Sequence, residues 1–179
     1  GCGLGTHADT KKIVEDVLAN HNKPMLIDAD ALNIISANQN LLQQISADTI
    51  ITPHPKEFDR LFGTCNNDFE RMNKALHYSK ELNIVIVLKN HHTLIAYKGN
   101  GYFNNTGNAG LAKGGSGDVL TGMITSLLGQ GYSSLQSAIL GVYLNGLAAD
   151  ISLENQSQES LLATDVIENI GKAFYFIRE

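Results

Sequence analysis

A glycine-rich segment that ends in an aspartate is the part of the sequence best suited to chemistry. Lys113 precedes residues 114–117, which read Gly-Gly-Ser-Gly, and Asp118 then opens an apolar helical pattern. Consecutive glycines at a helix start let several backbone N–H groups converge on one point, where the helix dipole adds partial positive charge. The segment lacks the spacing of a P-loop. Phosphate binding is nevertheless favoured here over a purely structural turn.

Asp118 allows two interpretations. It could be a helix N-cap, because the positive end of the dipole stabilises a carboxylate at a helix start. It could also be a general base that takes a proton from a substrate hydroxyl while that oxygen attacks a phosphorus held by the adjacent amides. Phosphoryl transfer demands little more of such a base than correct placement. The spacing alone leaves the two interpretations even.

Further polar residues follow short apolar runs. Asp28 and Asp30 come directly after residues 25–27, where they could cap the next helix or orient a polar substrate or a hydrated Mg²⁺. His54 stands between two prolines after residues 49–52, and these prolines are expected to fix an extended turn around it. Ligands bind doubly wound sheets at the carboxyl ends of the strands, so a substrate contact is favoured for this histidine.

The first five residues form a second glycine cluster. The sequence Gly-Cys-Gly-Leu-Gly lacks the Rossmann spacing, and no strand precedes it in the chain. A tight turn is therefore favoured over a nucleotide site. The absence of a starting methionine indicates a fragment.

Hydrophobic periodicity predicts alternating helices and strands, which indicate an α/β fold with a mostly parallel sheet. Short buried strands are expected at Met25–Ile27, Thr49–Thr52 and Ile84–Leu88, and helices at Asp9–Asn20, around 40–45, around 69–82, around 118–129, at 133–153 and at 164–177. A hairpin is expected from Thr93–Tyr97 and Tyr102–Asn104, with its turn at the pair Asn100-Gly101.

Composition and charge narrow the class of protein. The chain has 179 residues, of which 43% are hydrophobic, enough for one domain. The formal net charge is −5 and no basic run stands out, which argues against nucleic acid as the main partner. No apolar stretch reaches the roughly 18 residues of a membrane span and no leader pattern begins the chain, so a cytoplasmic location is expected. Cys2 and Cys65 are expected to be ordinary reduced thiols.

The motifs together resemble those of the ADP-dependent NAD(P)H-hydrate dehydratases of the ribokinase-like superfamily. The resemblance rests on Asp28–Asn33, on Thr52–Pro55 with Glu57, on Leu88-Lys89, on Asn108–Ala112, on Gly114–Leu120 and on Ala163–Asp165. It implies a three-layer α/β/α fold with a mostly parallel central sheet. Residues 1–179 would form one such domain that lacks its N-terminal part.

The resemblance also implies an activity. NADH or NADPH hydrated at the nicotinamide ring, in its S-epimer, would be phosphorylated on the ring hydroxyl by ADP (or ATP) and would then eliminate phosphate. The protein would be a lyase of metabolite repair that uses Mg²⁺ and forms a homo-oligomer, and in many bacterial members it is fused to an epimerase. Because the family carries roughly a hundred further residues at the front, a polypeptide that begins at Gly1 is expected to show weak or no turnover.

The resemblance assigns roles by motif. Asp118 would be the catalytic base, and Glu57 would organise Mg²⁺ through water. The nucleotide would be held by Lys89, Asn90, His91, His92, Thr93, Gly114, Gly115, Ser116 and Gly117. The hydrated cofactor would face Gly3, Gly5, Asp28, Asp30, Asn33, His54, Asn108 and Asp118.

Two alternatives stay open. A small-molecule kinase of the same fold, for instance one acting on a vitamin precursor, would share the glycine segment and the aspartate. A domain that binds nucleotide without turnover would share the glycine segment alone.

Overall fold

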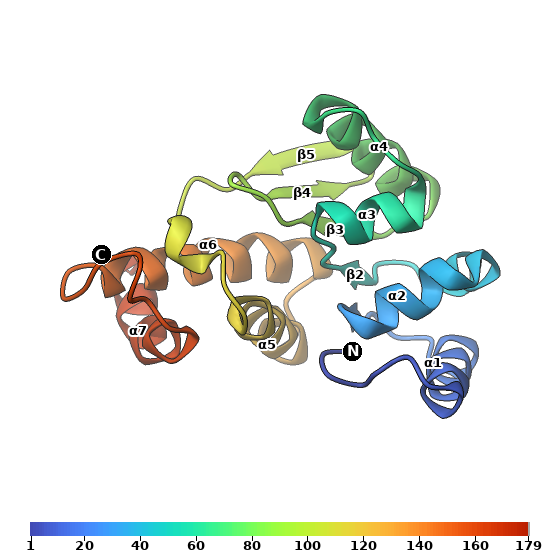
Figure 1. Cartoon of the computed structure of the whole chain (residues 1–179), viewed down its shortest axis with the longest axis horizontal. Helices are drawn as coiled ribbons and strands as arrows, with labels where there is room; N and C mark the ends of the chain where they lie inside the picture. Colours follow the sequence, from blue (N-terminus) through green and yellow to red (C-terminus); the bar gives the residue numbers. More distant parts are fainter. Residues whose placement is uncertain (179) are drawn as a thin grey trace. The chain divides into compact units, whose positions relative to one another are not determined.

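A computed structural model describes residues 1–178, which form an α/β fold around one mixed sheet (Figure 1). The five strands lie in the order β1 (Leu26–Ile27), β2 (Ile50–Ile51), β3 (Val85–Leu88), β4 (Leu94–Tyr97) and β5 (Asn100–Phe103). β1, β2 and β3 are parallel, whereas β4 and β5 continue the sheet antiparallel. All of β3 is buried, as expected of a continuous apolar run inside a sheet. The three predicted buried strands are confirmed.

Helices connect and cover the strands. They are α1 (Ala8–Asn20), α2 (Asp30–Ala37), α3 (Pro55–Phe62), α4 (Asp68–Glu81), α5 (Ser116–Gly129), α6 (Ser134–Ser152) and α7 (Ala163–Phe176). Two 3₁₀ segments, η1 (Gln39–Gln44) and η2 (Ala109–Leu111), complete the list. The helix expected around 40–45 is thus a 3₁₀ segment, typical of short connectors. None of the described helices is long and apolar enough to cross a membrane.

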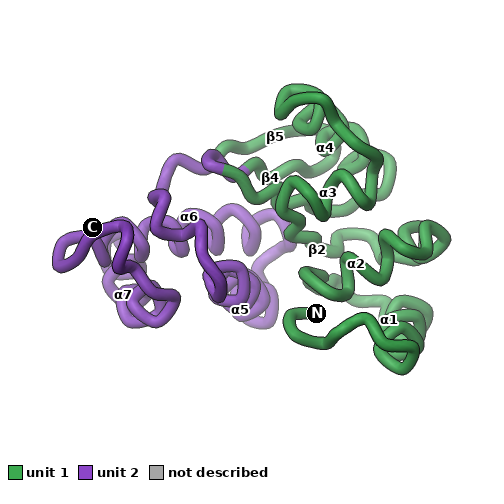
Figure 2. Tube along the Cα trace, viewed as in Figure 1, with its two compact units in different colours: residues 1–90, 94–103 green, residues 91–93, 104–179 purple. Residues whose placement is uncertain are grey.

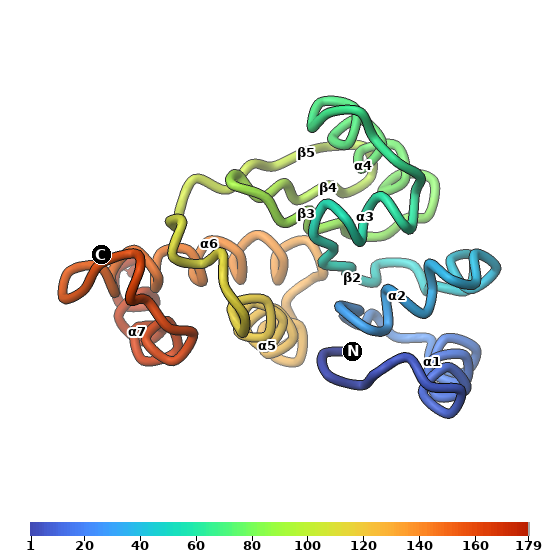
Figure 3. Tube along the Cα trace, in the orientation of Figure 1, coloured from blue at the N-terminus to red at the C-terminus, as the bar shows by residue number. Residues whose placement is uncertain are grey.

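The chain divides into two compact units (Figure 2). Unit 1 comprises residues 1–90 and 94–103, and unit 2 comprises residues 91–93 and everything from 104 onward. Unit 1 takes the blue-to-green part of the chain in Figure 3, whereas α5, α6 and α7 in unit 2 are yellow to red. Each unit contains its own cluster of buried apolar side chains.

The hairpin turn lies two residues earlier than the sequence predicted. Tyr97 pairs with Asn100, so the two-residue turn is Lys98-Gly99, and the expected turn pair begins β5 instead. Both turn residues have positive φ, 50° and 81°, as the tight hairpin turns that match strand twist require. The Gly99 N–H donates to Ser79 Oγ on α4 at 3.1 Å, which fixes the turn at this point.

Candidate functional site

An ion pair joins the carboxyl ends of β1 and β3. Asp28 directly follows β1 and is 2% exposed, and Lys89 directly follows β3. The Lys89 Nζ lies 3.1 Å from Asp28 Oδ1 and 3.4 Å from Oδ2. The sequence predicted both residues as site residues but not their pairing, because 61 positions separate them. Only the strand order β1-β2-β3 brings them together.

The turn after Asp28 fastens the glycine-rich start of the chain. Ala29 has a positive φ of 53°, and its N–H donates to Asp28 Oδ1 at 2.8 Å. Asp30 begins α2, and its Oδ2 accepts the N–H of Gly5 at 2.8 Å. The N-cap of α2 is Ala29, so the alternative in which these two aspartates cap the helix is wrong. Gly3 and Gly5 both have positive φ, as the predicted tight turn requires.

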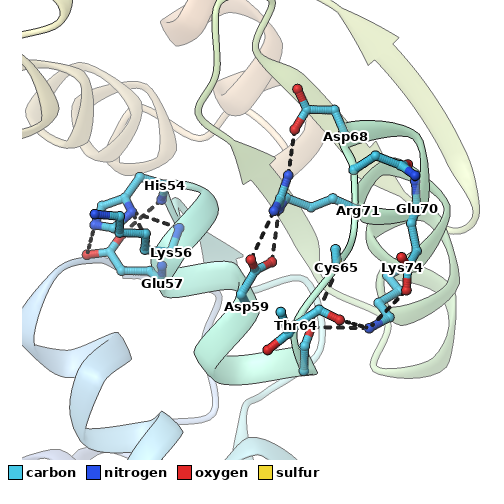
Figure 4. Close-up of polar contacts among 12 residues, drawn as sticks. His54, Lys56, Glu57, Asp59, Thr64, Cys65, Asp68, Glu70, Arg71 and Lys74 are labelled. Atoms are coloured by element: carbon cyan, nitrogen blue, oxygen red, sulfur yellow. Dashed lines mark hydrogen bonds and ion pairs between the residues drawn. The ribbon is translucent and has the colours of Figure 1, made fainter.

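His54 caps α3 with its imidazole ring. Its Nδ1 accepts the N–H groups of Lys56 and Glu57 at 3.1 and 3.3 Å, while Glu57 Oε2 accepts the His54 N–H at 2.8 Å (Figure 4). A neutral ring that accepts at Nδ1 carries its proton on Nε2. That proton sits on a side chain that is 44% exposed, with Nε2 3.5 Å from Glu57 Oε1.

The backbone of His54 is extended, as expected, with φ −78° and ψ 167°, but the extended turn does not continue beyond this residue. Helix α3 starts immediately at Pro55, because proline suits the first helical position and the ring of His54 satisfies the free N–H groups. Arg60 of this helix donates from Nη1 to Asn33 Oδ1 of α2 at 2.8 Å. Asn33 was predicted from the sequence as a site residue, whereas its partner Arg60 was not.

The segment predicted to hold the nucleotide falls across the two units. Lys89 and Asn90 belong to unit 1, and residues 91–93 belong to unit 2. Asn90 Nδ2 donates to Asp68 Oδ2 at 3.2 Å. The rings of His91 and His92 meet edge to face with centroids 4.4 Å apart, and both residues are exposed.

In unit 2, the loop before α5 is built on Asn108. Its Oδ1 accepts the Gly110 N–H at 3.0 Å and caps η2, while its Nδ2 donates to Asp150 Oδ1 at 2.9 Å. The Gly107 N–H donates to Asp150 Oδ2 at 2.7 Å. Asp150 was not among the site residues predicted from the sequence. The available signal was a single carboxylate within the apolar run 138–151.

The glycine segment enters α5 through a left-handed residue. Gly115 has φ 89° and is the N-cap, and a Cβ added there would lie 3.2 Å from the Ala163 Cβ. A Cβ on Gly114 would meet no atom of the described residues within 4 Å, so the loop is open at this point. Lys113 Nζ donates to the Glu159 carbonyl at 3.0 Å.

Asp118 lies in the first turn of α5 and is exposed. Because Gly115 is the N-cap, the interpretation of Asp118 as the cap is wrong. Its side chain lines a cavity of about 500 Å³ between α5 and α7, together with apolar residues that include Met123, Ile170 and Phe174. Asp118 is therefore exposed and borders this mainly apolar cavity, whose lining includes no residue of the glycine segment 114–117.

Asp165 of the C-terminal motif organises the start of α7. It accepts the Leu162 N–H at 2.7 Å and the Gln156 Nε2–H at 2.8 Å. Both hydrogen bonds lower the pKa of the Asp165 carboxyl below its usual range, and the one from the Leu162 backbone has the larger effect. The motif is therefore accounted for as a structural cap.

Among residues 1–178, no group of three or more His, Cys, Asp or Glu side chains gathers as a metal site. Glu57, the residue expected to organise Mg²⁺, is 6% exposed and uses Oε2 for the cap of α3. The side chains present therefore do not fit a metal cage of their own.

Charged residues stand at the strand ends of this α/β sheet, and a glycine loop leads into a helix whose first turn carries an exposed carboxylate. These features suit nucleotide-dependent phosphoryl transfer. The fold is ribokinase-like. An Enterococcus faecalis structure described as a ribokinase-like superfamily protein matches with a TM-score of 0.81 and 29% identity, over 99% of this chain and 61% of that one. More narrowly, the chain belongs to the NAD(P)H-hydrate dehydratase family, which it matches over residues 1–172.

Individual relatives agree with this assignment. The ADP-dependent (S)-NAD(P)H-hydrate dehydratase of Neisseria meningitidis is 42% identical over 161 residues, which cover 87% of this chain and 54% of the relative. A bifunctional NAD(P)H-hydrate repair enzyme of Thermofilum pendens is 35% identical over all of this chain and 35% of its own length. The crystal structure of the Bacillus subtilis ADP/ATP-dependent NAD(P)H-hydrate dehydratase, co-crystallised with ATP/Mg²⁺, matches with a TM-score of 0.83 and 32% identity.

The match to that solved structure covers 97% of this chain and 61% of the Bacillus subtilis chain. The chain thus spans between about a third and three fifths of the length of these relatives.

Proposed function

We propose that this chain carries the dehydratase chemistry of its family: ADP- or ATP-dependent dehydration of the S-epimer of hydrated NADH or NADPH. The observation that carries the proposal is the exposed Asp118 carboxylate, which follows an open glycine loop and lines a cavity. The names of the Neisseria and Bacillus relatives support the substrate and the nucleotide.

The reaction needs two steps. Asp118 accepts the proton of the ring hydroxyl as that oxygen attacks the terminal phosphorus of the nucleotide, which releases AMP from ADP. In the resulting phosphate ester, phosphate is a better leaving group than hydroxide. Its C–O bond breaks, phosphate keeps the electron pair, and the neighbouring ring carbon loses a proton, so that the double bond of the nicotinamide ring is restored.

The glycine segment would hold the phosphates during the first step. Position 115 requires glycine because its φ is positive. Position 114 has neither a positive φ nor a neighbouring atom that would exclude a side chain. Open space there lets a phosphate approach the backbone amides of residues 114–117 at the positive end of α5. Lys113 already donates to the Glu159 carbonyl, so the amides and not this lysine are given the main role.

The residues of unit 1 receive complementary roles. His54 would present its Nε2–H to the hydrated cofactor, because its Nδ1 is occupied by the cap of α3. Lys89 would offer its ammonium to a phosphate. The adjoining residues 90–93, of which 91–93 belong to unit 2, would also contact the nucleotide. Asp28, which is buried, would hold Lys89 in place. Asn33, Asp30 and the turn from Gly3 to Gly5 would line the same edge.

Magnesium would reach the site on the nucleotide. Mg²⁺ retains several waters and is commonly held by substrate phosphates with one or two carboxylates. No step is assigned to Glu57, whose carboxylate stabilises the start of α3. The partners would be the hydrated cofactor and ADP, with a fused epimerase in longer relatives of the Thermofilum type. The homo-oligomer, implied by the family resemblance, and the cytoplasmic location, expected from the sequence, both stay predictions.

The variant Asp118→Asn tests the proposal. With hydrated NADH and ADP, we expect its rate to fall by about 10²–10⁴-fold, measured both as regained nicotinamide absorbance and as released orthophosphate. ADP affinity, measured by calorimetry, should be unchanged, because the amides of the loop remain. Asp9→Asn is the matched control, since Asp9 also lies in the first turn of a helix. It should leave the rate unchanged.

Other outcomes separate the alternatives. A stable phosphorylated product without regained absorbance would identify a small-molecule kinase. ADP binding without any turnover, both by this chain and by a form extended at its N-terminus to the length of its relatives, would identify a nucleotide-binding domain. An unimpaired Asp118→Asn would show that the base is another residue.

A further inference from the structure

Asp150 occupies a position that is unfavourable for a carboxylate. It lies in the last turn of α6, where the free carbonyl groups give the helix end a partial negative charge. No ion pair within residues 1–178 involves this side chain. A carboxylate at this position lowers the stability of α6. The favourable interactions of Asp150 must therefore be with residues outside this helix.

Those interactions are with the segment that leads to the glycine loop. Asp150 Oδ2 accepts the Gly107 N–H at 2.7 Å, and Oδ1 accepts from Asn108 Nδ2 at 2.9 Å. Asn108 in turn accepts the Gly110 N–H at 3.0 Å. One carboxylate thus fixes the backbone of residue 107 directly and that of residue 110 through Asn108.

The neighbouring turns of α6 are fitted to the same segment. Thr106 Oγ1 donates to the Tyr143 carbonyl at 2.8 Å. A Cβ on Gly146 would lie only 2.6 Å from the Thr106 carbonyl carbon, so the segment passes directly over this glycine. Positions 143, 146 and 150 follow helical spacing and share one face. This face of α6 supports residues 106–108 over two turns.

The far end of the loop is held independently. Lys113 is tied to the Glu159 carbonyl, and Gly115 lies against Ala163 at the start of α7. The open backbone at Gly114 lies between these two contacts, and the turn held by Asp150 lies before them in the chain. Without Asp150 the segment would keep the Thr106–Tyr143 bond and its attachments at Lys113 and α5, but it would lose the hydrogen bonds that fix Gly107 and Asn108.

We propose that Asp150 is a positioning residue for the glycine loop: through Gly107 and Asn108 it holds the loop in the conformation in which its amides receive the phosphates. This rests on the proposed function, because the loop is the assigned phosphate site. Asp150 acts through the loop and touches neither nucleotide nor substrate.

The variants Asp150→Ala and Asp150→Asn separate this role from a merely structural one. Asp150→Ala removes both acceptors, but water can replace them because the Gly107 bond is exposed, so the protein should still fold. We expect about 10-fold weaker ADP binding and a KM for ADP raised by a similar factor. Asp150→Asn keeps one acceptor atom and should show an intermediate effect.

Three measurements test the inference together. Amide hydrogen exchange of the free protein should become faster at residues 107–117 in Asp150→Ala, but not in α5 beyond its first turn. ADP titrations should show the loss of affinity. The double variant Asn108→Ala/Asp150→Ala should lose less ADP affinity than the sum of the losses of the two single variants, because both residues belong to one chain of hydrogen bonds. The control is Glu154→Ala, a carboxylate just past the same helix end with no side-chain partner within residues 1–178.

Faster exchange with weaker ADP binding would support the inference. Unchanged exchange at residues 107–117, unchanged ADP affinity, or an equal loss in Glu154→Ala would overturn it. An unaltered protein that binds no ADP would contradict the proposed function instead, and the exchange data would still decide whether Asp150 holds the loop.

Discussion

Lys89 meets two demands with one ammonium group. Its side chain is 23% exposed, whereas that of Asp28 is 3% exposed, so the lysine reaches from a buried carboxylate towards the surface. An ammonium has three donors, and those not used by Asp28 remain available to a phosphate. The buried Asp28 carboxylate therefore holds the Lys89 ammonium in position before a ligand binds.

Removing the lysine charge should be costly to the fold. Lys89→Met leaves the Asp28 carboxylate buried without this partner, and we expect the free energy of unfolding to fall by roughly 3 kcal/mol. In Asp28→Asn/Lys89→Met no charge is buried, so much of that loss should be recovered. Urea unfolding measures both. Lys56→Met, at an exposed lysine on α3, should change little. A Lys89→Met protein as stable as the parent would show that the carboxylate does not depend on the pair.

Helices α3 and α4 are joined by a bidentate ion pair. Arg71 on α4 donates from Nε and Nη2 to the two carboxylate oxygens of Asp59 on α3, each at 2.9 Å (Figure 4). Lys74 donates to the carbonyl groups of Gly63 and Thr64 in the connecting loop, both at 3.1 Å. In the same loop, burial raises the pKa of the Cys65 thiol, which agrees with an unreactive reduced cysteine. These contacts fix the angle between the two helices.

The pair makes stability sensitive to acid. Hydrogen bonding from Arg71 lowers the pKa of the Asp59 carboxyl in the folded state. Its contribution is therefore fully present above the unfolded pKa of about 4 and is lost as the pH falls through the lower folded pKa. Asp59→Asn should be about 1–2 kcal/mol less stable at neutral pH and should lose less stability on acidification. Urea unfolding from pH 7 to pH 2.5 checks this, with Glu15→Gln on exposed α1 as the control. An unchanged pH profile would contradict it.

Local patterns predicted elements well where one signal dominates. The run Ile84–Leu88 could only be a buried strand, and the apolar spacing after Asp118 fitted one helix. Helix α3 was missed because two prolines beside His54 suggested an extended turn, although Pro55 is compatible with a first helical turn. The hairpin turn was misplaced because Asn-Gly is the stronger local signal, whereas the contact of Gly99 with Ser79 on α4 is tertiary.

At the scale of the whole molecule, the sequence predicted candidate site residues but not the contacts that hold them in place. Asp28 and Lys89 are paired only by strand order, and Asp150 reaches Asn108 from 42 positions away. No spacing rule encodes either contact, because both depend on how helices and strands pack. The division into two units was likewise not foreseen, because the chain passes between them within the continuous segment 90–94.

The central position of β3 should make it the most protected part of the sheet. β3 has a neighbour on both sides and is fully buried, whereas β5 is exposed and ends the described sheet on its side. Amides of β3 should therefore exchange only on global unfolding, and the unpaired side of β5 through local opening. Val87→Ala should lower the unfolding free energy by roughly 2 kcal/mol and speed β3 exchange accordingly. Phe103→Ala, at a side chain that is 62% exposed, should leave β3 exchange unchanged. Amide exchange in β3 as fast as that in β5 in the native protein would contradict the prediction that β3 is the most protected strand of the sheet.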